Sequence, residues 1–322
     1  MIAIQKLLRG LDTSAPVAFF HYYFKPPYGG SNQFMLALEQ GFIDNNIAVS
    51  RNKITASTKS CLLNAHVFDY DRLHTFKKKF PGIRIIHRID GPMQLYRGYD
   101  DGSDKRIASI NAELAHATVF QSLYSLHAHQ KLGICFNNAC VIQNAVNPSI
   151  FYPKGKKDIL DGKRKIRLLA VSWSDNPHKG GPFYSQLEKN LDWTRYEFTF
   201  IGRTKENFKH INHLPPVNSQ KLADVIKAHD IYVTASENDP CSNSLLEALS
   251  CGLPAVYLDS GGHKELVQKA GIGFTDPVGA LGALEEIVRN YHQYREAIKV
   301  PSLKEVTQKY IAVMLPSKDS TL

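Results

Sequence analysis

Short apolar runs alternate with longer amphipathic segments along the first half of the chain. An apolar and aromatic run over 16–24 is followed by a glycine turn, and 31–44 then repeats its apolar positions at helical spacing. Further strands are expected at 60–68, 84–90, 117–121 and 139–146, with helices between them that include 105–115 and 125–132. Because strands that alternate with helices form a parallel sheet covered on both faces, this half predicts an α/β domain.

A second series of the same kind follows a polar break. Residues 148–165 are charged and interrupted by Pro153, Gly155 and Gly162, which is typical of a linker. Strands are then expected at 166–173, 196–201, 231–235 and 255–258, helices at 279–291 and 302–314, and a glycine-containing loop at 270–274. The expected units are an N-terminal Rossmann-like domain (1–150), a linker (151–165), a C-terminal Rossmann-like domain (166–300) and a last helical segment (301–322). Two such domains place a ligand cleft between the carboxyl ends of their sheets.

Composition narrows the class of protein. The chain has 322 residues, of which 43% are hydrophobic and 21% charged, as in an ordinary soluble globular protein of more than one domain. Apolar runs are too short for a membrane span, and the first ten residues lack a signal-peptide core, so we expect a cytoplasmic location. The five cysteines show no metal-type spacing and are expected to be reduced thiols.

The net charge of +9 favours anionic ligands or surfaces. Basic clusters at 154–157 and 163–167 flank the expected linker, and we interpret them as solvated charge. A peripheral contact with the anionic inner face of a membrane is the alternative. Nucleic-acid binding is not expected, because the sequence has no zinc-finger, RNA-recognition or basic-zipper pattern.

The segment over 230–267 is the most informative for function, and it predicts strand, loop, helix, strand, loop and helix. Asp239 lies in the loop before the first helix and Glu247 lies within that helix, so both carboxylates can line one crevice. The helix begins with three small polar residues, Ser242, Asn243 and Ser244. Free N–H groups and the helix dipole favour an anion there, and carboxylates accept strong hydrogen bonds from sugar hydroxyls. Carboxylates that accept hydrogen bonds from hydroxyl groups, beside a site for phosphate, fit a nucleotide sugar.

This segment resembles the signature of the retaining family-four glycosyltransferases of GT-B fold. The signature has two glutamates separated by seven residues, a Leu-Glu-Ala helix, a Cys-Gly break, a strand, and a Gly-Gly turn followed by Glu-Leu-Val. Asp239 stands in the position of the first glutamate. The resemblance implies that Asp239, or Glu237 in its place, faces the donor sugar and that Glu247 holds the ribose hydroxyls. A capped helix with solvated carboxylates is the alternative, since Asp is a common turn residue.

Two segments of the N-terminal half also resemble parts of this family. Gly29 and Gly30 lie between the first strand and the first helix, where their backbone can approach a ligand. The resemblance implies that this loop lies near the donor diphosphate and the acceptor. His87 lies in the strand at 84–90, and the family often has a histidine near this place that contacts the donor sugar; a structural histidine is the alternative. Because side chains alternate along a strand, His87, Arg88 and Asp90 cannot all share one face.

A segment of the C-terminal half also resembles a part of this family. Residues 172–181 resemble the family loop that offers an arginine and a lysine to the donor phosphates. Lys179 matches the lysine, whereas Ser or Trp stands in the arginine position, and Arg203 is the candidate to compensate. A solvated lysine at a helix start is the alternative for Lys179. Glu265 resembles the glutamate after the family's Gly-Gly turn, which helps to shape the nucleotide site.

Together these segments predict a retaining GT-B glycosyltransferase, and the resemblance implies that its last helix crosses back to the N-terminal domain. Such a hexosyltransferase would move a sugar from a nucleoside diphosphate to a hydroxyl of a glycan or lipid-linked acceptor, as in polysaccharide biosynthesis. Neither a cofactor nor a metal is expected, since Lys179 and helix N–H groups can hold the diphosphate. Two alternatives stay open: an epimerase or phosphorylase of the same fold, and a non-catalytic protein that binds a nucleotide sugar or a polyanion.

Overall fold

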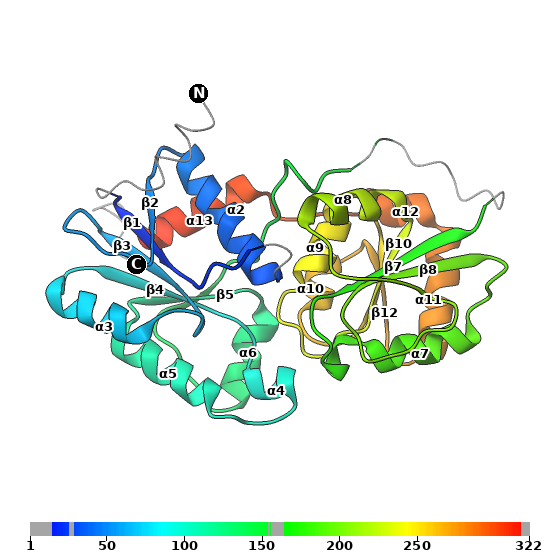
Figure 1. Cartoon of the computed structure of the whole chain (residues 1–322), viewed down its shortest axis with the longest axis horizontal. Coiled ribbons are helices and arrows are strands. Elements are labelled where there is room, and N and C mark those ends of the chain that lie inside the picture. The colour runs from blue at the N-terminus through cyan, green and yellow to red at the C-terminus, as the bar shows by residue number, and fades with distance from the viewer. Residues whose placement is uncertain (1–14, 26–28, 154, 156–163, 317–322) are drawn as a thin grey trace.

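The structure is a computed structural model that describes residues 15–25, 29–153, 155 and 164–316, and it contains two α/β domains that lie side by side (Figure 1). Most of the linker expected at 151–165 lies outside the described residues, and the domain boundaries therefore stay predictions. Among the residues described, no helix has the length and apolar character that a membrane span needs.

The N-terminal domain is built on a six-stranded sheet in the order β2-β1-β3-β4-β5-β6, whose neighbouring strands pair in parallel. Its strands are β1 (Val17–Phe20), β2 (Val49–Arg51), β3 (Ser60–Asn64), β4 (Arg84–Ile89), β5 (Ala117–Phe120) and β6 (Ala139–Val141). Its helices are α2 (Gly30–Asp44), α3 (Tyr70–Lys79), α4 (Met93–Arg97), α5 (Ser103–Leu114) and α6 (Leu123–Lys131). All residues of β1, β3 and β5 are buried, as expected for strands covered on both faces.

The C-terminal domain is built on a second six-stranded parallel sheet, in the order β12-β11-β10-β7-β8-β9. Its strands are β7 (Ile166–Ser172), β8 (Tyr196–Gly202), β9 (Asn212–Leu214), β10 (Ile231–Thr234), β11 (Ala255–Leu258) and β12 (Gly271–Phe274). Its helices are the 3₁₀ turn η1 (Pro177–Lys179), α7 (Gly181–Asn190), α8 (Ser219–Ala228), α9 (Asn243–Ser250), α10 (His263–Val267), α11 (Pro277–Arg289) and α12 (Tyr291–Glu296).

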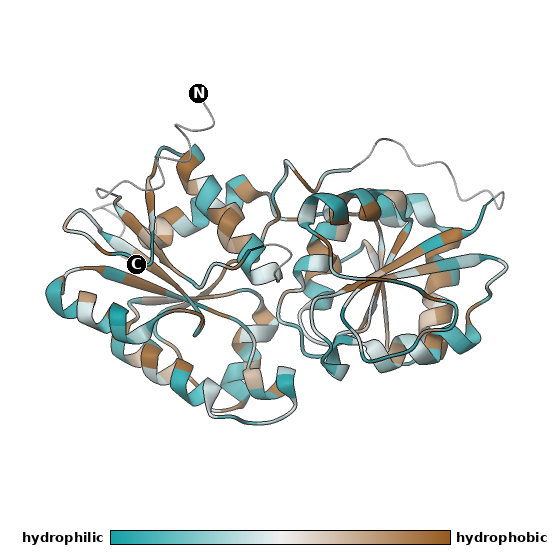
Figure 2. Ribbon diagram, in the orientation of Figure 1, coloured by the Kyte–Doolittle hydropathy of each residue, from teal (hydrophilic) through white to brown (hydrophobic). Residues whose placement is uncertain are grey.

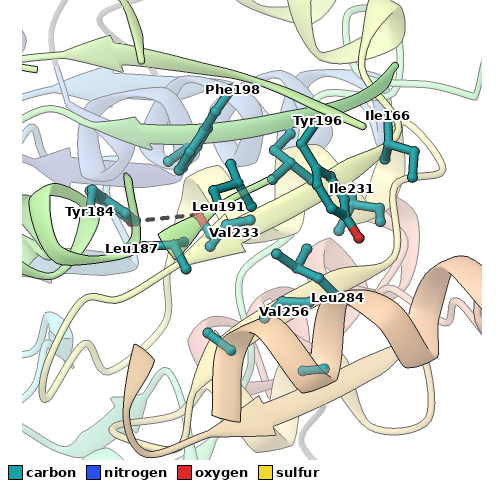
Figure 3. Close-up of a cluster of buried hydrophobic side chains, with 14 of the residues drawn as sticks. Ile166, Tyr184, Leu187, Leu191, Tyr196, Phe198, Ile231, Val233, Val256 and Leu284 are labelled. Atoms are coloured by element: carbon teal, nitrogen blue, oxygen red, sulfur yellow. Dashed lines mark hydrogen bonds between the residues drawn. The ribbon is translucent and has the colours of Figure 1, made fainter. Parts of the chain in front are cut away.

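Apolar side chains fill the space between this second sheet and its helices. In the close-up, Tyr184 and Leu187 of α7 lie near Val233 of β10, and Leu284 of α11 lies beside Val256 of β11 (Figure 3). The outer surfaces of the helices are mostly hydrophilic, and their apolar stripes face the sheets (Figure 2). This is the amphipathic pattern that the sequence predicts for helices that cover a sheet.

The last helix, α13 (Leu303–Met314), returns to the N-terminal domain and lies beside α2 (Figure 1). A capping box at Ser302 fixes its start. The ring of Tyr310 packs on Phe34 of α2, with 6.0 Å between the ring centroids, and Arg84 Nε donates to the carbonyl oxygen of Val313 at 2.9 Å. The predicted fold, with two Rossmann-like domains and a helix that crosses back, is thereby confirmed.

One expected loop proved to be a strand. Residues 270–274 were expected to form a loop on account of their glycines, but Gly271–Phe274 pairs in parallel with β11. Gly271 is needed for this pairing, since a Cβ atom there would lie 1.9 Å from the carbonyl oxygen of Ala255. The glycine therefore indicates close approach of two backbones.

The strand order of each sheet indicates where a crevice opens. In the first sheet the order reverses between β1 and β3, and in the second between β7 and β10. Connections that leave neighbouring strands toward opposite faces open a crevice at the carboxyl ends of those strands. In both domains, the loops that follow these strands carry residues that line one shared cavity.

Candidate active site

A cavity of about 490 Å³ lies between the two domains. Its N-terminal wall comes from the end of β4 and from the segments that follow β1, β3 and β4, and it includes Gly29, Gly30, His66, Arg88, Asp90 and Tyr96. Its C-terminal wall comes from the loops after β7 and β10 and from α9, and includes Trp173, Lys179, Asp239, Ser242, Asn243, Ser244 and Glu247. The cavity therefore brings together segments that lie more than two hundred residues apart in the sequence.

Lys179 and Asp239 form an ion pair in the cavity wall. Nζ of Lys179 donates to Oδ2 of Asp239 at 2.7 Å and lies 4.6 Å from the ring centroid of Tyr96. Burial by itself would raise the pKa of Asp239, but the charge of Lys179 and the hydrogen bonds from Lys179 and from the backbone N–H of Cys241 outweigh it and hold the pKa below its usual value. Burial likewise opposes the charge of Lys179, yet the Asp239 carboxylate raises the pKa of the lysine. Both groups are therefore ionised at neutral pH.

Glu247 is the second carboxyl group of the cavity and has a different environment. It lies in α9, is buried, and has no hydrogen-bond partner within the described part of the chain. Burial raises its pKa to about 8, because the ionised form loses the solvation that water provides. Glu247 is thus largely protonated at neutral pH.

The start of α9 faces the start of α2 across the cavity. Ser242 caps α9 by accepting a hydrogen bond from the backbone N–H of Leu245 at 3.4 Å. A Cβ atom on Gly30 would lie 2.6 Å from the Asn243 side chain, so only glycine allows the two helices to come this close. Two helix N-termini therefore present N–H groups to the same space.

His87 does not reach the cavity, although the resemblance implied that it would. Its side chain is fully buried within the N-terminal domain, where Nε2 bonds to the carbonyl oxygen of Ala65 at 2.7 Å. Burial lowers its pKa to about 4, so the ring is neutral. The position of His87 matches the alternative interpretation, a structural histidine.

Asp90 and His66 lie at the cavity instead, and neither was singled out from the sequence as a site residue. The alternation of side chains along β4 offered a signal, since it separates Asp90 from His87. His66 gave no such signal, because it follows a buried strand in a loop whose course only the fold defines.

Arg203 lies outside the main cavity and lines a smaller neighbouring pocket of about 80 Å³. Its guanidinium stacks on Trp173, with 4.3 Å from Cζ to the ring centroid, and Trp173 lines the main cavity. Glu237 is exposed, and its carboxylate bonds to Nδ1 of His178 at 2.7 Å. The structure thus brings neither Arg203 nor Glu237 together with Asp239 in the cavity.

Glu265 joins the two domains and does not line the cavity. Its carboxylate accepts hydrogen bonds from the backbone N–H groups of Leu123 at 2.8 Å and Tyr124 at 2.6 Å, at the start of α6 in the N-terminal domain. A carboxylate at a helix N-terminus satisfies otherwise free N–H groups and interacts favourably with the helix dipole. Close by, the Tyr124 hydroxyl donates to Oδ1 of Asn238 at 2.9 Å. These contacts hold the domains together beside the cavity.

The arrangement of two facing parallel sheets, an interdomain cavity and a returning last helix defines the GT-B class of fold. A sucrose-phosphate synthase from Thermosynechococcus elongatus has this fold with a TM-score of 0.68 at 13% identity, covering 93% of this chain and 94% of that one. HepE of Anabaena, solved with UDP and glucose, gives a TM-score of 0.64 at 12% identity, covering 92% and 94%. WaaG, a glycosyltransferase involved in lipopolysaccharide biosynthesis, gives 0.65 at 13% identity, covering 94% and 100%.

Sequence comparison adds a match over part of the C-terminal domain. Residues 183–291, about a third of the chain, match the family described as Glycosyl transferases group 1. A probable sucrose-phosphate synthase of Thermosipho melanesiensis is 26% identical over 188 residues, which cover 53% of this chain. The match spans 43% of the length of that relative, less than half of it.

Proposed function

We propose that the protein transfers a sugar from a nucleoside diphosphate to a hydroxyl acceptor. The observation that carries the proposal is the gathering of Lys179, Asp239 and Glu247 around one cavity at the carboxyl ends of two facing sheets. A cation, two carboxyl groups and two helix N-termini match the phosphates and hydroxyls of a nucleotide sugar. The family match over the C-terminal domain supports the same assignment.

In this proposal, the C-terminal wall binds the nucleotide. Glu247 accepts hydrogen bonds from the ribose hydroxyls, and the apolar side chains of Ile201, Val217 and Leu222 line the part of the cavity that takes the base. Hydrogen bonds from hydroxyl groups favour the ionised form of a carboxyl group. Binding of a ribose to Glu247 therefore lowers its raised pKa and releases a proton.

In the proposed transfer step, negative charge develops on the leaving diphosphate. The bond between the anomeric carbon and the phosphate oxygen breaks, and its electron pair goes to the leaving diphosphate. Lys179 and the N–H groups at the start of α9 stabilise the charge that develops there. The acceptor oxygen bonds to the anomeric carbon, and its proton goes to the leaving phosphate. Retention of configuration, independence of metal and of any cofactor, and a glycan or lipid-linked acceptor are parts of this proposal.

A ligand screen followed by turnover measurements tests the proposal. UDP, GDP and ADP and their hexose conjugates should raise the melting temperature, because a ligand that binds only the folded state stabilises it. UDP-glucose is the first donor to test, since HepE was solved with UDP and glucose. Donor consumption with saccharide acceptors should persist in excess chelator, and the anomeric configuration of the product should match that of the donor.

The alternatives give different results in the same experiments. An epimerase would convert the nucleotide sugar without an acceptor, a phosphorylase would need inorganic phosphate, and a binding protein would give a thermal shift without turnover. Complete loss of transfer with chelator, restored by magnesium or manganese, would contradict metal independence. A cytoplasmic location and a peripheral contact with an anionic membrane are proposed as well, and sedimentation with vesicles that contain anionic lipid tests the contact.

A further inference from the structure

Asp90 presents one free carboxylate oxygen in the cavity. Its Oδ1 accepts hydrogen bonds from Nη1 of Arg88 at 3.2 Å and from Nε2 of Gln121. Its Oδ2 has no hydrogen-bond partner among the residues that the structure describes. The side chain is 32% exposed and lines the interdomain cavity. A carboxylate oxygen that is left without a donor in an otherwise bonded group is a ready acceptor for a ligand hydroxyl.

Oδ1 of Asp90 is held in place by a network of hydrogen bonds. Arg88 is fully buried, and its guanidinium also donates to Asn64 and, at 3.0 Å, to Asn144. The Asn144 amide donates to the side-chain oxygen of Gln121 at 2.9 Å and to that of Asn243 in the other domain at 3.0 Å. The orientation of Asp90 is therefore fixed from both domains, which keeps Oδ2 directed away from this network.

Asp90 lies close to the loop that carries Asp239. A Cβ atom on Gly91, the residue after Asp90, would lie 3.1 Å from Cβ of Pro240, the residue after Asp239. The two carboxylates thus belong to touching loops at one part of the cavity. Both carboxylate oxygens of Asp239 have hydrogen-bond partners, unlike those of Asp90. Oδ2 of Asp239 accepts from Lys179 and Ser236, and its Oδ1 accepts from the backbone N–H of Cys241.

We propose that Oδ2 of Asp90 binds a hydroxyl group of the donor sugar, so that the N-terminal domain holds the sugar opposite Asp239 and contributes to the choice of sugar. This inference rests on the proposed function. An ionised carboxylate forms a charge-assisted hydrogen bond with a hydroxyl, which is stronger than a neutral one. Asp90 acts in binding the sugar, whereas the base, ribose and diphosphate bind elsewhere in the cavity.

The test compares nucleotides with and without the sugar. In Asp90→Asn the amide oxygen can keep the bonds to Arg88 and Gln121, while an NH₂ group replaces the free oxygen. Calorimetry with UDP, GDP and ADP and with UDP-glucose, GDP-mannose and ADP-glucose gives the contribution of the sugar as a ratio of affinities. For the nucleotide that binds, we expect the diphosphate to keep its wild-type affinity and the sugar conjugate to bind about tenfold more weakly.

Two further variants support the comparison. Asp90→Glu keeps the charge but moves the oxygen, and it should also lose the preference for the sugar conjugate. Asp71→Asn, at an exposed position in α3, should leave both affinities unchanged. An equal loss for diphosphate and conjugate, or an unchanged ratio in Asp90→Asn, would overturn the inference. If wild-type protein binds none of these nucleotides, the proposed function itself fails, and this inference fails with it.

Discussion

Nζ of Lys179 lies 2.7 Å from Oδ2 of Asp239, and this ion pair joins the turn η1 to the loop that precedes α9. A bound diphosphate would compete with Asp239 for the lysine. The pair therefore keeps both groups charged and in place, and it leaves the lysine able to turn toward a stronger anion.

Replacement of Lys179 should affect turnover and stability in distinguishable ways. Lys179→Met removes the cation that would stabilise the leaving group, and we expect turnover to fall by about 10²-fold or more. It also leaves Asp239 buried without its partner, which should lower the free energy of unfolding by about 3 kcal/mol.

A double variant separates the two effects. Lys179→Met with Asp239→Asn should recover most of the lost stability and none of the turnover, because no buried charge is then left unpaired. Lys189→Met, at an exposed position of α7, is the control. Wild-type turnover in the single variant would show that Lys179 has no part in the chemistry.

Glu247 should make stability depend on pH. Its pKa is about 8 in the folded protein against a usual value of 4.5, so the folded state binds more protons than the unfolded state between these values. The contribution of Glu247 to the free energy of unfolding is at its full value below pH 4.5, decreases as the pH rises through 8, and changes no further above that. Glu247→Gln should therefore be more stable than wild type by several kcal/mol at pH 9 and similar at pH 4.5.

Urea unfolding at pH 4.5, 7 and 9 measures this difference, with Glu296→Gln as an exposed control. Glu247→Gln should at the same time bind nucleoside diphosphate more weakly, by about 1–3 kcal/mol, if the carboxylate holds the ribose. Equal pH dependence in the variant and in wild type would show that Glu247 is not a buried neutral acid in the ligand-free protein.

Two helical glycines should respond in opposite ways to replacement by alanine. In Gly30→Ala the new Cβ atom would meet the Asn243 side chain, which must move and give up its bond to Asn144. We expect nucleotide binding to weaken about fivefold, as for the loss of a hydrogen bond. Gly282→Ala in α11 meets no atom within 4 Å, and it should keep the affinity and gain up to about 1 kcal/mol of stability.

Removal of the Glu265 carboxylate should loosen the contact between the domains. Glu265→Ala leaves two N–H groups at the start of α6 without an acceptor, which should cost about 1 kcal/mol in the free energy of unfolding. Small-angle scattering of the ligand-free variant should give a larger radius of gyration than that of wild type. Lys264→Ala, at the neighbouring exposed position, should change neither quantity.

Local pattern in the sequence was enough to predict much of the fold. Apolar runs predicted the buried strands β1, β7 and β10, because parallel strands that are covered on both faces have few polar positions. The glycines of β12 led to the expectation of a loop, whereas Gly271 allows a close backbone contact with β11. The three-residue strands β2 and β9 were not expected, since such short segments carry too little periodicity to be recognised.

The sequence also determined which residues share one short segment. Asp239, the polar residues at 242–244 and Glu247 lie within nine positions, and a loop followed by a helix necessarily keeps them together. Lys179 could be placed at the same site only through a resemblance, because its contact with Asp239 spans sixty residues.

Tertiary structure alone decided which residues of the N-terminal domain face the cavity and which charged groups serve the contact between domains. His87 and Asp90 are three residues apart, yet one is enclosed between sheet and helix while the other lies at the cavity. Glu265 has a family-like sequence context, but its carboxylate bonds to α6, more than a hundred residues earlier in the chain. Local propensity acts over a few residues, whereas these positions depend on how two separately formed sheets pack, and that packing is set by contacts between distant segments.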